Sequence, residues 1–538
     1  MVVSLLLGAF IILACILSNR LSQRFGVPTL LAFILLGMLF GSDGLFKIPF
    51  NDYAFAETIC SAALVLIMFY GGFGTNWRAA RPVAGKALVL SSFGVLLTAG
   101  LTGLFCHFAL GLSMLEGMLV GAVLGSTDAA SVFSILRSKR LDLKYGTASL
   151  LEVESGSNDP FAYMLTVLLL SALQGAGASG WQIVRMIVLQ LLVGVVIGVI
   201  VGVLSGVILR GFHFSTDGFD AAFVLAVAFL SYAAAAFLGG NGYLSAYLAG
   251  ILLGNTRIPR KRGLVSFFDG VTGLTQMLIF FLLGLLATPS RLPQVLPMAC
   301  AVALFLTLVA RPAATALLLT PLRSPVRQQL LISWAGLRGA ASIVFAVTVT
   351  VSGAALTSDL FHIVFAVVLL SIAIQGSLLP FVARRLQMID ANANVMKTFN
   401  DYVDETAVQF IQLRVKEGHP WAGHAVRDLS LPPKILLVMV LRGDQTLTPN
   451  GDTMLEAGDI AVLCAEGFDD ERHIGLYEMS IDPGHPWDGQ SIYALPLEKG
   501  ELIVLIRRGE EIVIPSGKTH VRAGDILVLN RDETLVAS

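Results

Sequence analysis

The sequence predicts an α-helical polytopic membrane protein with thirteen spans, two inverted repeats and broken helices, followed by a small α+β cytoplasmic domain. Three observations lead to this prediction: the composition, the alternation of basic loops, and a duplication near the C-terminus. Of 538 residues, 55% are hydrophobic and only 14% are charged, whereas soluble domains carry about 25% charged residues. The net charge of −1 argues against a nucleic-acid partner.

Apolar segments fill the first 385 residues. A helix that crosses a bilayer needs about 20 mostly apolar residues. On this measure the expected spans cover residues 2–18, 27–42, 54–72, 84–110, 114–136, 147–174, 181–209, 219–238, 242–254, 264–287, 293–319, 328–350 and 358–382. The first segment has no charged leader, so we expect a spanning helix rather than a removed signal peptide.

Basic residues alternate along the loops between these segments. Cytoplasmic loops collect Lys and Arg, and here the loops after the odd-numbered spans are basic. The other loops hold little beyond Lys47 and Arg291. We therefore expect a multi-pass protein of the cell inner (plasma) membrane with its N-terminus outside and its C-terminus in the cytoplasm.

Two of the expected spans are interrupted by glycine and a charged residue. Residues 125–128 (Gly-Ser-Thr-Asp) break span 5, and residues 334–341, which include Arg338, break span 12. Interrupted helices at corresponding places in two halves are typical of transporters built from inverted repeats. Unwound backbone is tolerated at that depth only where protein or a water-filled cavity surrounds it. Spans 1–6 and 8–13 would form the repeats, with span 7 as a bridge.

Carboxylates lie beside or inside the interrupted region. Residues 151–160 bring Glu154 and Asp159 into span 6, and a charge at mid-bilayer costs about 2.5–3.5 kcal/mol. We predict that Asp159 and Asp128 line a cation and proton site, although Asp128 has a second interpretation as a cap for the half-helices. Asn158 is neutral and carries no second proton, which favours exchange of one proton for one monovalent cation.

Glu154 is expected to serve a different purpose from Asp159. Five helical positions separate the two residues, so their side chains point about 140° apart. We predict a structural ion pair between Glu154 and Arg338, which leaves Asp159 free for transport. Arg311 precedes Pro312, and we expect it to stabilise a helix kink or to reach the interface by snorkelling.

These motifs resemble monovalent cation/proton antiporter family 1, which includes NhaP-type bacterial antiporters and animal sodium/proton exchangers. The resemblance covers residues 1–385 and is carried by Thr127-Asp128, by Glu154-Ser155 with residues 158–160, and by residues 336–339 (Gly-Leu-Arg-Gly). It implies the NhaA-like antiporter fold and a homodimer in which a core domain moves against a dimerisation domain.

The resemblance also implies roles for single residues. Asp159 would be the exchange carboxylate, and Asp128, the Thr127 backbone and Ser155 would bind the cation, with Asn158 beside them in the site. One position departs from the family pattern. Many members have an acid in the phenylalanine/glycine motif at the end of span 3, and here Tyr70 stands in residues 69–73. Any part that this acid plays in ion access is therefore in doubt.

The last third of the chain contains a duplication. Beyond a transmembrane domain (1–385) and a linker (386–404), we expect two repeats, at 405–470 and 471–538. Gly-His-Pro-Trp at 418–421 recurs at 484–487, and Ala-Gly-Asp-Ile at 457–460 recurs at 523–526, an offset of 66 residues typical of duplication. Short β-branched runs between Gly/Pro turns predict strands, with a short helix from Trp421 or Trp487.

The repeats resemble the C-terminal regulatory (TrkA-C-like, RCK-C) domain of potassium-channel and antiporter gating proteins. The resemblance makes a cytosolic ligand, such as cyclic di-AMP or another nucleotide, a candidate regulator, although no residue identifies it. A simpler interpretation is that the repeats only help to dimerise or stabilise the transporter.

The function that these features predict is secondary antiport of cytosolic potassium for external protons, with sodium as the alternative cation. A ligand-gated cation channel is a further alternative, but a channel would need a filter of backbone carbonyls such as a Thr-Val-Gly-Tyr-Gly-like segment, and the sequence has none. The scattered His and Cys residues suggest no enzyme site and no cofactor. The expected partners are membrane lipid, a second copy through both domains, and a small-molecule regulator.

Overall fold

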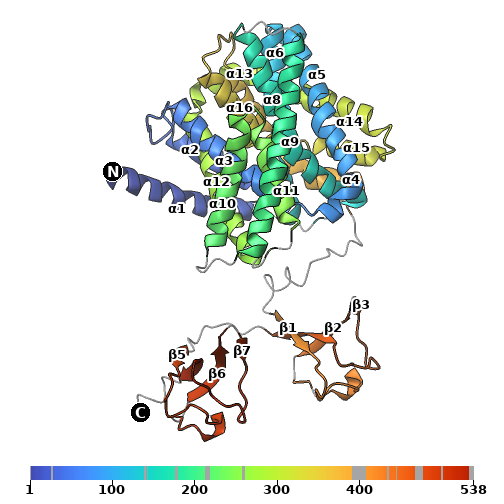
Figure 1. Ribbon diagram of the computed structural model, residues 1–538. Coiled ribbons are helices and arrows are strands. Elements are labelled where there is room, and N and C mark those ends of the chain that lie inside the picture. The colour runs from blue at the N-terminus through green and yellow to red at the C-terminus, as the bar shows by residue number, and fades with distance from the viewer. Residues whose placement is uncertain are drawn as a thin grey trace. The chain divides into compact units, whose positions relative to one another are not determined.

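The computed structural model describes most of the chain, in two compact units, Met1–Ala393 and Asn394–Ser538 (Figure 1). The described residues are 2–25, 28–138, 141, 143–175, 180–212, 218–256, 258, 261–389, 408–429, 431–432, 435–443, 445–466, 476–497, 501–509 and 511–531. Residues 390–404 of the expected linker lie outside these ranges.

The described part of the first unit is helical apart from loops and one isolated bridge between Leu143 and Ile389. Its α-helices are α1 (Val2–Phe25), α2 (Thr29–Phe40), α3 (Tyr53–Gly74), α4 (Trp77–Val89), α5 (Val95–Leu110), α6 (Met114–Val123), α7 (Ala129–Ser138), α8 (Thr147–Leu173), α9 (Gly180–Gly211), α10 (Phe219–Phe237), α11 (Gly242–Gly254), α12 (Lys261–Leu286), α13 (Leu292–Phe305), α14 (Arg311–Leu319), α15 (Val326–Trp334), α16 (Ala340–Val351), α17 (Leu360–Leu370) and α18 (Ser377–Arg385).

Three π-helical segments and two 3₁₀ turns join some of these helices. The π-helical segments are η1 (Leu90–Gly94) between α4 and α5, η4 (Leu306–Ala310) between α13 and α14, and η5 (Ser371–Gly376) between α17 and α18. The 3₁₀ turns are η2 (Lys144–Gly146) and η3 (Pro289–Arg291). Single-turn π-helical segments are frequent at functional sites, and η5 supplies a contact to the site described below.

Seven helices in the described part of the chain are long and apolar enough to cross a membrane. They cover Tyr53–Gly74, Ala80–Leu110, Gly180–Gly211, Phe219–Phe237, Gly263–Leu286, Pro289–Leu319 and Leu360–Arg385. The other expected spans are shorter apolar helices or, like α8, carry several acids. Thirteen spans therefore stay a prediction.

Small residues let the helices of this unit approach closely. A Cβ atom on Gly250 of α11 would lie 2.1 Å from the Phe69 carbonyl oxygen of α3, and one on Gly254 would lie 2.0 Å from that of Phe73. Close backbone contact through glycine is typical of helix packing in membranes, where the hydrophobic effect does not drive helices together.

Both predicted helix breaks are confirmed. α6 ends at Val123 and α7 begins at Ala129, while α15 ends at Trp334 and α16 begins at Ala340. The breaks leave backbone groups without helical partners, and the candidate site is built on how these groups are satisfied.

The second unit contains two four-stranded antiparallel sheets with the same topology. The strands are β1 (Val408–Arg414), β2 (Leu436–Arg442), β3 (Gln445–Leu447), β4 (Ile460–Glu466), β5 (Leu476–Ser480), β6 (Glu501–Arg508), β7 (Glu511–Val513) and β8 (Asp525–Arg531). Their order is β1-β4-β2-β3 in one sheet and β5-β8-β6-β7 in the other. The matching order supports the duplication read from the sequence.

The α+β prediction for this unit is wrong for its described residues, which hold only strands and the single 3₁₀ turns η6 (Val426–Asp428) and η7 (Ile492–Ala494). A glycine with positive φ begins each Gly-His-Pro-Trp segment, and another lies two residues beyond its end: Gly418 (81°) and Gly423 (78°) in the first repeat, and Gly484 (90°) and Gly489 (77°) in the second. Such a left-handed residue ends a helix rather than continuing it.

An equivalent ion pair between a partly exposed arginine and a buried aspartate stabilises each sheet. The Arg442 guanidinium donates to both carboxylate oxygens of Asp459, at 2.8 Å each, and Arg508 binds Asp525 in the same way at 2.8 and 2.7 Å. These hydrogen bonds lower the pKa of Asp459 and of Asp525. Each carboxylate therefore stays ionised at neutral pH and joins the strand that ends at its arginine to the start of the last strand of the sheet.

Candidate ion-binding site

The two helix breaks lie against each other. The Asp128 amide in the first break donates to the Leu337 carbonyl in the second, at 2.8 Å. A Cβ atom on Gly339 would lie 2.4 Å from Asp128 Cβ, so a side chain at position 339 would collide with Asp128. The motifs at 125–128 and 336–339, more than 200 residues apart in sequence, thus form one structural element.

Arg338 binds the unsatisfied end of α6. Its Nη1 donates to the carbonyls of Leu124 and Ser126, the second at 2.8 Å, and its backbone amide donates to Ser371 Oγ of η5 at 3.0 Å. The last carbonyls of a helix carry partial negative charge. The fully buried guanidinium therefore stabilises the break itself.

The predicted ion pair between Glu154 and Arg338 is wrong in its partner. Glu154 on α8 forms a salt bridge with Arg311 at the start of α14, and both residues are buried. The Arg311 side chain lies against the second break, since a Cβ atom on Gly336 would be 2.9 Å from its Nε. Arg338 is not the partner of Glu154, because its guanidinium donates to the carbonyls of the first break instead. Arg311 follows η4, but it is buried and does not snorkel.

Thr127, Ser155 and Asn158 form a closed network of hydrogen bonds. Asn158 Nδ2 donates to Thr127 Oγ1 at 2.6 Å, and the Thr127 amide donates to Asn158 Oδ1 at 3.3 Å. Ser155 Oγ donates to the Thr127 carbonyl at 2.6 Å. The structure therefore brings these three predicted site residues together, and they hold the unwound Thr127 against α8.

Asp159 lies beside the same break but binds a different residue. Ser126 Oγ donates a hydrogen bond to Asp159 Oδ1, and both residues are buried. Our reading of the sequence did not single out Ser126, although it directly precedes Thr127-Asp128. A signal was available: a hydroxyl inside an interrupted helix has no helical role that would explain it.

Asp128 takes the N-cap position of α7. Its carboxylate accepts from the Ser131 amide at 3.2 Å and from Ser131 Oγ at 2.5 Å, which is the usual N-cap contact to the third residue of a helix. The capping interpretation of Asp128 is thus confirmed. The cap holds the carboxylate within the break that also carries Ser126.

A family comparison agrees with this geometry. The model of the family described as "Sodium/hydrogen exchanger, transmembrane" matches residues 9–385. The chain belongs to the sodium/hydrogen exchanger family. It is therefore a multi-pass membrane cation/proton antiporter by family. The TrkA-C domain model matches twice in the second unit, at residues 410–467 and 476–532.

Several relatives of the exchanger resemble it over most of their length. It is 36% identical over 466 residues to the K(+)/H(+) antiporter NhaP2 of Shewanella baltica (strain OS223), covering 86% of this chain and 80% of the relative. It is 34% identical over 465 residues to the K(+)/H(+) antiporter NhaP of Alkalimonas amylolytica, covering 86% and 81%.

The structure of the sodium proton antiporter MjNhaP1 from Methanocaldococcus jannaschii at pH 8 has the same fold. It superposes with a TM-score of 0.63 at 22% identity, covering 72% of this chain and 99% of that chain. The antiporter fold of the first unit is thereby confirmed.

An acid from another helix lies near Tyr70, the residue that replaces the acid of the family's phenylalanine/glycine motif. The Tyr70 hydroxyl at the end of α3 donates to Asp269 Oδ1 of α12 at 2.6 Å. A carboxylate from another helix therefore lies beside the tyrosine that replaces the acid of the motif.

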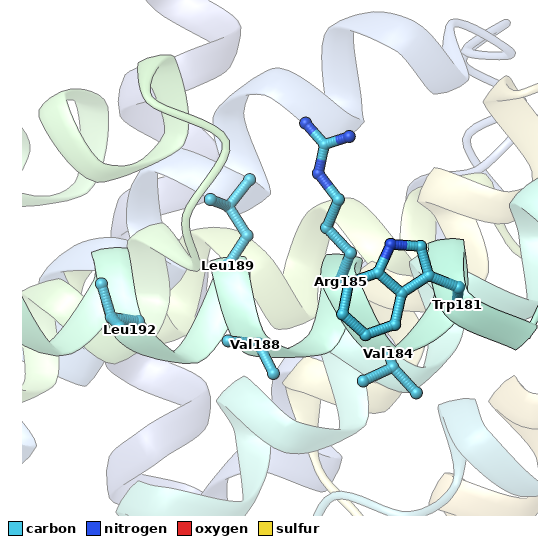
Figure 2. Close-up of a pocket in the computed structure, with 6 residues that line it drawn as sticks. All are labelled: Trp181, Val184, Arg185, Val188, Leu189 and Leu192. Carbon is cyan, nitrogen blue, oxygen red and sulfur yellow. The ribbon is translucent and has the colours of Figure 1, made fainter.

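A shallow groove of about 240 Å³ follows one face of α9 in this exchanger. Figure 2 shows the residues that line it, which are Trp181, Val184, Arg185, Val188, Leu189 and Leu192. None of them belongs to the ion-binding site. A tryptophan and an arginine at the end of a long apolar helix are typical of the membrane–water interface.

Proposed function

We propose that this exchanger moves potassium out of the cytosol in exchange for protons, and that Asp159 binds the two ions in turn. The main support for this proposal is the position of Asp159, which is a buried carboxylate beside an unwound helix. Its Oδ1 accepts a hydrogen bond from a neutral hydroxyl rather than from a cationic side chain. A carboxylate that no arginine among the described residues neutralises is available to a proton or a cation.

The charges around the site support exchange of one ion for one proton. Asp128, Glu154 and Asp159 are the three carboxylates of the site, and Arg311 and Arg338 are its two guanidinium groups, which leaves one negative charge. Because unpaired charges are costly at this depth, one proton or one monovalent cation would neutralise the site in either half of the cycle.

The transport cycle that we propose is alternating access in a thirteen-span homodimer built from two inverted repeats. The positions of the irregular segments support the repeats. The fourth and eleventh expected spans both contain a π-helical segment, η1 and η4, and the fifth and twelfth are both broken. Such matched irregularities in two halves are typical of transporters with inverted repeats.

Potassium is the proposed cation because relatives that cover most of this chain are named K(+)/H(+) antiporters. The test is proton flux reported by a pH-sensitive dye in vesicles that contain the purified chain, with K⁺, Na⁺, Li⁺ and Rb⁺ compared across pH. We expect K⁺ to drive proton flux at the lowest concentration. Flux driven better by Na⁺ would identify a sodium/proton antiporter, and conduction without proton coupling would identify a channel.

We further propose that the tandem TrkA-C domains sense a cytosolic small molecule, of which a nucleotide is the candidate, and shift the transport equilibrium. Such a ligand must bind differently to the two transport states. Deletion of residues 401–538 is expected to leave exchange intact and to remove its dependence on cytosolic ligands, measured as flux with and without a cytosolic extract. Complete loss of exchange in a correctly inserted protein would contradict this role.

A further inference from the structure

Ser126 lies between the two groups that define the site. Its carbonyl accepts from Arg338 Nη1 at 2.8 Å, and its hydroxyl donates to Asp159 Oδ1. The arginine fixes the backbone of the break, and the hydrogen bond directs the side chain to α8. Its side chain is therefore held beside the carboxylate by two independent contacts.

The hydroxyl oxygen of Ser126 retains the capacity to bind a cation. A hydroxyl has one donor and two acceptor lone pairs, and the donor is used on Asp159. No residue in the described ranges donates a hydrogen bond to Ser126 Oγ. Because the residue is only 1% exposed, bulk water does not routinely satisfy these lone pairs.

The other neutral oxygens of the site are already engaged with one another. Thr127 Oγ1 accepts from Asn158, Asn158 Oδ1 accepts from the Thr127 amide, and the Thr127 carbonyl accepts from Ser155. This network fixes the shape of the break. Ser126 Oγ differs from these atoms because it contacts Asp159 directly and only donates.

We propose that Ser126 Oγ is a direct ligand of the transported monovalent cation, which it shares with the carboxylate of Asp159. The hydroxyl continues to donate to Oδ1 while a lone pair faces the ion, so the site gains an oxygen ligand without an additional charge. This inference rests on the proposed function and adds a binding residue to it.

The test compares three variants of the full chain in vesicles: Ser126→Ala, Ser126→Thr and Ser157→Ala. Ser157 is a matched control because it is a buried serine of α8 whose hydroxyl donates to the Val153 carbonyl of its own helix at 2.7 Å. The readouts are the maximal proton flux and the half-saturating concentration of Li⁺, Na⁺, K⁺ and Rb⁺.

Ser126→Ala is expected to raise the half-saturating K⁺ concentration about fivefold to tenfold, with the maximal flux within about twofold of wild type. The increase is expected to be larger for Li⁺ and Na⁺ than for Rb⁺, because a smaller ion holds an oxygen ligand at a shorter distance. Ser126→Thr, which keeps the hydroxyl, should restore wild-type affinity, and Ser157→Ala should match wild type.

Unchanged half-saturating concentrations in Ser126→Ala would overturn the proposal, as would an equal increase for all four cations. If the alanine variant does not insert into the membrane, Ser126→Cys provides the same comparison, since sulfur is a poor ligand for these hard cations. Absence of cation-dependent flux in the wild type would instead overturn the proposed function, so the two failures are distinguishable.

Discussion

Replacement of Asp159 by asparagine is expected to abolish cation-dependent proton flux. The amide has nearly the same shape as the carboxylate and keeps an acceptor for the Ser126 hydroxyl, but it carries no charge and binds no proton at physiological pH. Both halves of the proposed exchange therefore lose their binding group. The measurement is dye-reported proton flux in vesicles on addition of K⁺ or Na⁺, and the expected signal is that of vesicles without protein.

A suitable control is Asp43→Asn, an exposed acid in the loop after α2 whose carboxylate accepts from the Ser290 amide of η3 at 2.7 Å, away from the ion-binding site. This variant should exchange normally. Full activity of Asp159→Asn at wild-type levels of inserted protein would remove Asp159 from the mechanism, and with it the proposal that one carboxylate serves both ions.

Replacement of Arg311 by leucine is expected to cause the largest loss of stability among substitutions at the site. It leaves the Glu154 carboxylate buried without its partner, and breaking such a pair usually costs about 3–5 kcal/mol. The measurement is the free energy of unfolding of the purified chain in detergent, with Arg185→Leu as a control. Arg185 is an exposed arginine of α9, and its replacement should change stability little.

A double-variant comparison distinguishes Arg311 from Arg338 as the partner of Glu154. Leucine at both 154 and 311 should recover part of the stability lost in Arg311→Leu, because an apolar pair often replaces a buried ion pair without loss. Glu154→Leu combined with Arg338→Leu should recover less of the stability lost in Arg338→Leu. In that double variant the carbonyls of Leu124 and Ser126 would still lack their donor. The opposite order of recovery would restore the pair inferred from sequence.

The ion-pair partner of Glu154 could not be predicted from the sequence. Arg338 was the natural choice because it lies in the second break, whereas Arg311 stands in an apolar helix before a proline and looked like a kink or interface residue. Which arginine pairs with Glu154 depends on which acceptors each guanidinium reaches. The packing of α14 on α8 and the crossing of the two breaks determine this, and residue spacing predicts neither.

The C-terminal repeats show the same division between what the sequence predicts and what the fold decides. The 66-residue offset predicted two equivalent units, and the sheets have equivalent strand orders. In the described residues the expected short helices are reduced to the single 3₁₀ turns η6 and η7. A glycine with positive φ begins each Gly-His-Pro-Trp segment and another lies two residues beyond it, which interrupts regular helix there. The pairing of Arg442 with Asp459, and of Arg508 with Asp525, became visible only once the strands were aligned.

The sequence by itself determined that this is a membrane protein with two interrupted helices, an acidic motif in a third and a duplicated C-terminal domain. Composition, charge and the positions of glycines are properties of short segments of the chain, so these features can be predicted without knowledge of the fold. Only the tertiary structure decided which groups meet: Ser126 with Asp159, Arg311 with Glu154, and Arg338 with the carbonyls of a broken helix. These contacts join residues of different helices, and the physical reason is that a buried donor can pair only with an acceptor that packing brings within reach, whatever the distance in sequence.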